Sequence, residues 1–165
     1  MKKMFFAIGV VLFMWSCKNP ADNKTGETTN VKKTVELPLS VGYKGEAAIG
    51  KQENIVAVMN WNKHMIAGHV DSAAAFIADS MLVNLADGST FNLSHDSAIA
   101  MLKGWRGSMD SAKQSYGAVI AVDNTTAGDE WVIQWTDESY FRKGKEEHVM
   151  LSESYRLKNG KIRQV

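Results

Sequence analysis

Ala67–Gly88 reads AGHVDSAAAFIADSMLVNLADG, and its order of breaks and apolar runs indicates the architecture of the folded part of this chain. Apolar residues recur at helical spacing from about Lys51 until Gly68 interrupts them, so a first helix is expected to end there. Asp71 then stands where it can cap a short second helix that runs to Phe76–Ile77. This half of the stretch predicts two helices separated by a glycine.

The other half of the stretch changes to short strands around a tight turn. Met81–Leu85 and Thr90–Leu93 flank Asp87-Gly88, a dipeptide typical of hairpin turns. Ser94 or Asp96 next offers a cap for a third helix. The apolar stripe of that helix consists of Ile99, Leu102, Trp105 and Met109.

The rest of the chain alternates with a period of two, as half-buried strands do. Four such segments follow one another, separated by turns: Gln114–Asp123, Glu130–Arg142, Lys145–Leu157 and Lys161–Val165. Three helices followed by an antiparallel meander predict an α+β fold, in which a curved antiparallel sheet wraps over three N-terminal helices.

This order resembles the SnoaL-like branch of the nuclear transport factor 2 superfamily, over about Glu53 to Val165. The resemblance is carried by Ala67–Gly88, by the helix SHDSAIAMLKGW and by the ending ESYRLKNGKI at Glu153–Ile162. It implies a cone-shaped domain with a pocket inside the bent sheet, and a homodimer is common among such domains. The superfamily contains isomerases, cyclases, dehydratases and non-catalytic binders, so the fold does not give the function.

Isomerase chemistry of the ketosteroid type is not expected. Carried over by the resemblance, its carboxylate position falls on Leu85 and its tyrosine position on Trp61. Leucine cannot take up a proton, and an indole can donate a hydrogen bond but cannot act as an acid. Both catalytic roles of that enzyme type are therefore vacant here.

The two faces of each long strand suggest which side chains point into the cone. On Glu130–Arg142 the more apolar face carries Trp131, Ile133, Trp135, Asp137, Ser139 and Phe141, and we expect it to point inward. The opposite face, with Gln134, Thr136 and Tyr140, is then a candidate dimer surface. On the next strand the apolar face carries Val149, Leu151, Glu153, Tyr155 and Leu157.

Three carboxylates are candidates for chemistry. Glu153 and Asp137 fall on the expected inner faces, where each is either a pocket acid with a raised pKa or one half of an ion pair. Asp79 is either a general base or, as we favour, a turn residue that hydrogen-bonds nearby backbone.

The expected ligand pocket is hydrophobic, with the alternative that its aromatic rings simply fill the core. Its candidate lining is Trp61, Met65, Trp105, Trp131, Trp135, Leu151, Glu153 and Tyr155.

The N-terminal sequence predicts that the protein is located outside the cytoplasm. Two lysines precede the apolar run Met4–Ser16, and Cys17, the single cysteine of the chain, follows it directly. This arrangement resembles a bacterial lipoprotein signal, in which the cysteine is acylated and becomes the first residue. The expected divisions are a signal peptide at 1–16, a lipid-anchored flexible tether at 17–36, an extended arm at 37–50 and the cone domain at 51–165.

Composition excludes several other functions. The net charge is +1 and no basic stripe is visible, so nucleic-acid binding is not expected. The four histidines do not form a spaced cluster, so no metal site is expected, and no cofactor motif is present. Two hypotheses remain: a membrane-anchored, non-catalytic domain that binds a small hydrophobic molecule, and an enzyme of the same fold that uses Glu153 or Asp137 as acid or base.

Overall fold

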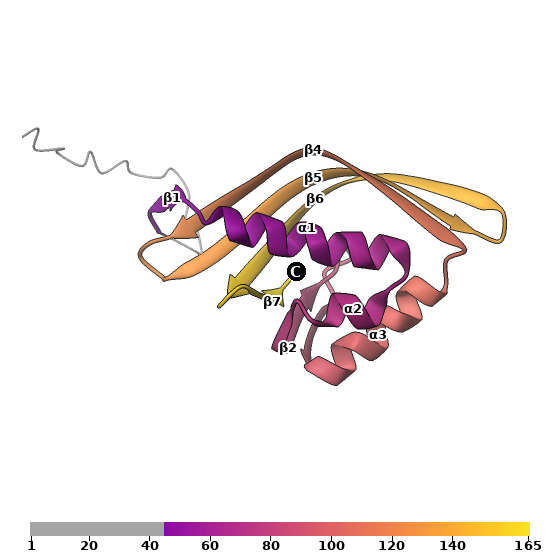
Figure 1. Cartoon of the computed structure of the whole chain (residues 1–165), viewed down its shortest axis with the longest axis horizontal. Coiled ribbons are helices and arrows are strands. Elements are labelled where there is room, and N and C mark those ends of the chain that lie inside the picture. The colour runs from indigo at the N-terminus through magenta and orange to yellow at the C-terminus, as the bar shows by residue number, and fades with distance from the viewer. Residues whose placement is uncertain (1–44) are drawn as a thin grey trace, which may run out of the picture. The chain divides into compact units, whose positions relative to one another are not determined.

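The computed structural model describes residues 45–165, and Cys17, the tether and most of the arm lie outside this range. Three helices and seven strands follow in the order β1, α1, α2, β2, β3, α3, β4 to β7 (Figure 1). Their bounds are Ala47–Ile49 for β1, Gln52–Ala67 for α1, Val70–Ala74 for α2, Ile77–Asn84 for β2, Thr90–Ser94 for β3, His95–Gly107 for α3, Ser111–Asn124 for β4, Asp129–Arg142 for β5, Lys145–Lys158 for β6 and Lys161–Gln164 for β7.

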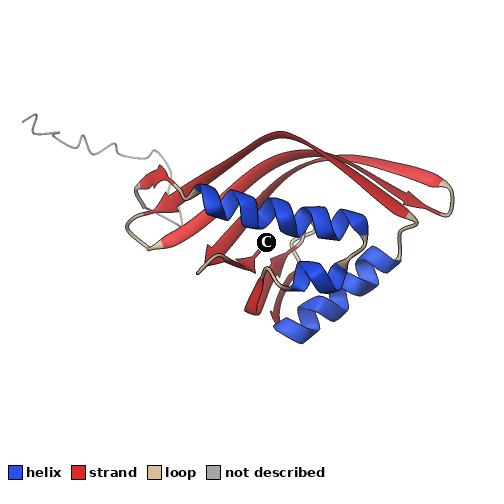
Figure 2. Ribbon diagram, viewed as in Figure 1, coloured by secondary structure: helices blue, strands red, loops and turns tan. Residues whose placement is uncertain are grey.

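All seven strands form one sheet in the order β1-β4-β5-β6-β7-β2-β3. The sheet is bent, and the three helices lie on its concave side, with α1 running along β4 to β6 (Figures 1 and 2). Neighbouring strands are antiparallel except β2 and β7, which pair in parallel. The expected α+β fold, with a curved sheet over three helices, is confirmed.

A bulge in β4 contributes to the bend of the sheet. The pairing with β5 passes from Tyr116 opposite Thr136 to Ala118 opposite Trp135, so Gly117 is an extra residue. Such a bulge increases local bending and changes which alternate side chains face inward. Gln114 and Tyr116 therefore share the concave face with Val119 and later residues of the strand.

The end of the first helix and the cap of the third agree with the prediction, whereas the second helix ends at Ala74, short of the predicted Phe76–Ile77, because β2 already begins at Ile77. Gly68 ends α1 in the left-handed conformation at φ 81°, which glycine adopts without strain. The side chain of Ser94 caps α3 by accepting a hydrogen bond from the backbone N–H of Ser97. Asp71, in contrast, lies inside the short α2, whose capping position is His69, and Asp79 lies within β2.

The expected orientation of the Glu130–Arg142 strand was wrong. Trp135 on β5 is 43% exposed, whereas Gln134 is fully buried and Glu138 is 4% exposed. The concave face of β5 is thus the polar one, because its polar groups hydrogen-bond to one another and to α1, β4 and β6. Trp131, Ile133, Trp135 and Asp137 point to the convex side, and Gln134, Thr136 and Tyr140 are not on a dimer surface.

The core lies between the concave face and the helices. It joins α1 and α3 to residues of every long strand. Its buried members are Val58, Trp61, Met65, Val70, Ala73, Ile77, Met81, Val83, Ala98, Leu102, Ala121, Val132, Tyr155, Leu157 and Ile162.

Two tryptophan substitutions test this assignment of the faces. Trp61 is 8% exposed and Trp135 is 43% exposed, so only the first ring leaves a cavity when it is removed. We expect Trp61→Ala to lower the free energy of unfolding by about 3–5 kcal/mol and Trp135→Ala by less than about 1 kcal/mol. Denaturant unfolding of both variants measures the difference, and equal losses would contradict the assignment.

Candidate functional site

Three buried polar side chains on the concave face form a closed ring of hydrogen bonds. Asn62 on α1 donates from Nδ2 to Gln134 Oε1 at 2.9 Å, and Gln134 donates from Nε2 to the hydroxyl of Tyr155 at 3.2 Å. The Tyr155 hydroxyl lies 3.5 Å from Asn62 Oδ1 and closes the ring. Because each member orients the next, these contacts fix the position of α1 over β5 and β6.

Glu153 is attached to this ring from β6. Its Oε2 accepts a hydrogen bond of 2.6 Å from Gln134 Nε2, across a directly paired position of the two strands. Burial raises the pKa of the Glu153 carboxyl, and the negative charge of Glu138 adds to this effect. Glu153 is nevertheless only half-buried, unlike Gln134 and Tyr155.

Glu138 forms a second polar group further along β5. Its Oε1 accepts hydrogen bonds from Gln114 Nε2 at 2.6 Å and from Thr136 Oγ1 at 2.8 Å, and its Oε2 accepts one from the Tyr140 hydroxyl. The side chain is therefore almost completely buried but well supplied with donors.

Tyrosine hydroxyls link the two groups and remain protonated. Burial raises the pKa values of Tyr116 and Tyr140, and it raises that of Tyr155 strongly. The charges of Glu138 and Glu153 act on all three in the same direction. Each hydroxyl consequently acts as a neutral donor or acceptor, and none is a candidate base near neutral pH.

A hollow of about 310 Å³ opens beside this cluster, between α1 and the part of β4 that lies before the bulge. Tyr116 and Gln114 line it from β4, and Gln114 in turn donates a hydrogen bond to Glu138. The remaining lining comes from α1 and consists of Met59, Asn60, Lys63 and Ile66.

Trp61 contributes an unusual group to the same interior. Its ring packs edge-on against Tyr155, with 5.5 Å between the ring centres. The indole Nε1 is buried and finds no acceptor within residues 45–165. A buried donor without an acceptor costs free energy, so an acceptor placed beside this atom would stabilise the folded chain.

The structure brings together only part of the predicted pocket. Trp61, Met65 and Tyr155 belong to the core, and Leu151 and Glu153 lie on the concave face. Trp105 is 41% exposed and packs edge-on against Tyr140 at 5.7 Å, where α3 meets the far end of β5.

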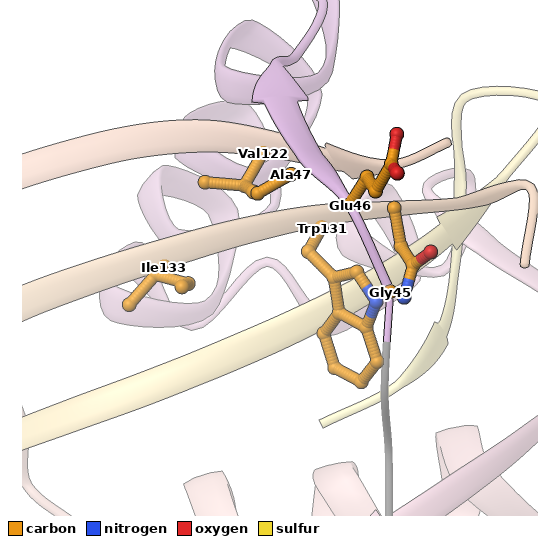
Figure 3. A pocket seen from close by; sticks show the side chains of 7 residues that line it. Gly45, Glu46, Ala47, Val122, Trp131 and Ile133 are labelled. Carbon is orange, nitrogen blue, oxygen red and sulfur yellow. The ribbon is translucent and has the colours of Figure 1, made fainter. Parts of the chain in front are cut away.

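The convex side holds the other predicted residues. Asp137 is exposed there and bonds to His148 on β6. Trp131 borders a separate hollow of about 300 Å³ with Val122, Ile133 and the first described residues of the chain (Figure 3). Asp137 and the tryptophans Trp131 and Trp135 therefore do not take part in the interior site.

Sequence reasoning missed the central residues of the interior cluster, namely Asn62, Gln114, Tyr116, Gln134 and Glu138. A signal was present, since Gln134, Thr136 and Glu138 alternate along one face of a strand. A row of polar residues that can satisfy each other is as compatible with burial as an apolar row.

Two further properties concern the described residues as a group. Between Gly45 and Val165, no three histidine, aspartate or glutamate side chains come together as a metal site would require. No helix in this range is long and apolar enough to cross a membrane.

Comparison with solved structures agrees with this architecture. No protein-family model and no curated protein sequence matches the chain. A LEH-like epoxide hydrolase of M. tuberculosis superposes with a TM-score of 0.58 at 13% identity, over 68% of this chain and 79% of that one. A protein of Kribbella flavida gives 0.54 at 12% identity, over 69% and 84% of the two chains.

Bal32a, from a soil-derived mobile gene cassette, gives a TM-score of 0.53 at 14% identity over 68% of this chain and 86% of its own. At such low identities these likenesses show the fold alone. The described part of the chain has the nuclear transport factor 2-like fold.

The raised pKa of Glu153 predicts how stability depends on pH. Between the unfolded pKa of about 4.3 and the higher folded pKa, the folded chain holds more protons than the unfolded one. The contribution of Glu153 to stability is therefore present at low pH and is lost as the pH rises through the folded value.

Glu153→Gln should remove this loss, because an amide keeps an acceptor for Gln134 but cannot ionise. We expect the variant to be more stable than the wild type at pH 7 by on the order of 1 kcal/mol, and less different at pH 4. Denaturant unfolding at several pH values measures this. A variant that is equally destabilised at both pH values would contradict the assigned pKa direction.

Proposed function

We propose that this chain, with its nuclear transport factor 2-like fold, binds a small and largely apolar molecule on the concave side of the sheet. The observation that carries the proposal is a difference in exposure within one network: Gln134 and Tyr155 are 0% exposed, whereas Glu153 is only half-buried. Val149 and Leu151 precede Glu153 on the same face of β6 and are half-buried as well. Glu153 is thus the polar contact at the end of an apolar strip, as in many small-molecule sites.

The hollow beside Tyr116 supports the same interpretation. Its volume is at the lower end of the range found for ligand sites, and apolar side chains of Met59 and Ile66 line it together with polar ones. One similar structure is described as an epoxide hydrolase, so a domain of this fold can accommodate a small organic substrate.

Acid/base catalysis by Glu153 is the second candidate function. It is favoured by the raised pKa of that carboxyl, a property of catalytic acids. However, the polar atoms of Asn62, Gln134 and Tyr155 are engaged with one another and with Glu153 itself. We therefore propose a rigid binding wall without catalysis, and Glu153→Gln distinguishes the two. In this variant a binder still binds its ligand, although more weakly because the polar contact has changed, whereas an enzyme loses about two to four orders of magnitude in rate.

We further propose that the chain works outside the cytoplasm, held to a membrane by a lipid on Cys17. The apolar run before the cysteine supports this, and it is too short for an ordinary membrane span.

A homodimer through the convex face is also proposed. Ile120, Trp135 and Met150 are exposed there, at 43%, 43% and 79%, and an exposed apolar patch of this kind is typical of an interface. Sedimentation equilibrium measures the self-association, and a strictly monomeric protein at high concentration would exclude it.

The ligand proposal predicts that filling the hollow weakens binding. Met59→Trp adds a ring at its rim, and Ile120→Trp adds one to the convex face at similar exposure, 39% against 43%. We expect a co-purifying apolar molecule, identified by native mass spectrometry, to bind about tenfold more weakly to the first variant only. Equal affinity for both variants, or no bound molecule from any source, would contradict the proposal.

The anchor proposal predicts labelling at a single residue. Cells fed a labelled fatty acid should incorporate it into the wild type and into Lys18→Ala, but not into Cys17→Ala. The Cys17→Ala protein should also leave the membrane fraction or keep its N-terminal segment. Incorporation into Cys17→Ala would refute acylation at this position.

A further inference from the structure

Among residues 45–165, no cation pairs with the two carboxylates of the concave face, Glu138 and Glu153. The hydrogen bonds that Glu138 and Glu153 accept within the described chain come from neutral donors: Gln114, Thr136 and Tyr140 for the first, and Gln134 and Tyr155 for the second. Neither carboxylate has a lysine or arginine nitrogen within salt-bridge distance in this range. Buried carboxylates are normally paired, because burial alone strongly disfavours the charge.

The nearby arginines are committed elsewhere. Arg142 pairs with Glu147 at the tip of the β5–β6 hairpin, and Arg156 pairs with Asp129 at the other end of the sheet. Arg106 donates to the carbonyl groups of Met65, Ile66 and Met109, which closes the end of α1. Lys63 lines the hollow and is exposed.

Aromatic rings border both carboxylates. Tyr140 donates to Glu138 and packs against Trp105, and Tyr116 lines the hollow. Tyr155 and the ring of Trp61 lie behind Glu153. Aromatic faces together with carboxylates are the chemistry that proteins use to recognise organic cations.

The Trp61 indole adds an independent requirement. Its buried Nε1 donor has no acceptor within the described residues, and neither an ammonium group nor an apolar body supplies one. A molecule with an oxygen acceptor beside its nitrogen would satisfy both the carboxylates and this donor.

We infer that the ligand is a protonated organic amine that carries an oxygen acceptor and an apolar body, with its nitrogen held by Glu138 and Glu153. This inference rests on the proposed function of the same site, and it adds the chemical class of the ligand. The amine supplies the positive charge that the described chain does not place beside these carboxylates, and its apolar part lies along Val149 and Leu151.

The test uses three compounds with one aromatic skeleton and one ether oxygen, which differ only in ending as an amine, an alcohol or a carboxylate. Calorimetry with the intact chain at pH 7 should give an affinity for the amine at least tenfold above that for the alcohol, and the weakest binding for the carboxylate. Equal binding of amine and alcohol overturns the inference but leaves the proposed function standing. Binding of none of the three counts against both.

Matched variants show which carboxylates contribute to binding of the amine. Glu153→Gln and Glu138→Gln should each lower the affinity for the amine about tenfold and leave that for the alcohol within about twofold. Asp137→Asn, which removes a carboxylate from the convex side of the same strand, should change neither affinity.

Thermal melts show which variants remain folded. Should Glu138→Gln unfold, because three donors depend on that carboxylate, Glu153→Gln still decides the question. An unchanged preference for the amine in folded Glu153→Gln, or the same loss in Asp137→Asn, overturns the inference.

Discussion

The polar face of β5 must be buried without leaving its side chains unpaired. Gln134, Thr136 and Glu138 point toward the helices, where water cannot satisfy them, and an unmade hydrogen bond there costs about 1–3 kcal/mol. Partners come from α1 through Asn62, from β4 through Gln114 and from β6 through Tyr155. The need to pair every buried polar side chain of β5 therefore fixes the positions of α1, β4 and β6 relative to that strand.

The bend of the sheet makes this arrangement possible. The extra residue Gly117 shifts the alternation of β4, so that Gln114 and Tyr116 face the same side as Val119 and Ala121. Without this shift, either Gln114 and Tyr116 or Val119 and Ala121 would point to the convex side of the sheet. The bulge therefore allows one strand to serve both the apolar core and the polar site.

The two faces of β5 have the opposite chemistry from what its local pattern suggests. The concave side near Glu138 is polar and acidic, while the convex side carries Trp131, Ile133 and Trp135. The interior of the domain near Glu138 is consequently polar, although the rest of the core is apolar.

The sequence alone was sufficient for the α+β class, the order of elements from α1 onward, the end of α1 at Gly68 and the hairpin at Asp87-Gly88, because local propensities and periodicity determine these features. It also placed Glu153 on a face with Leu151 and Tyr155, since alternation along one strand is a local property. It could not decide which face of β5 is buried: that depends on partners from Asn62, Gln114 and Tyr155, which are distant in the chain. Only the tertiary structure assembles those donors and acceptors, and their mutual satisfaction outweighs the greater hydrophobicity of the tryptophan face.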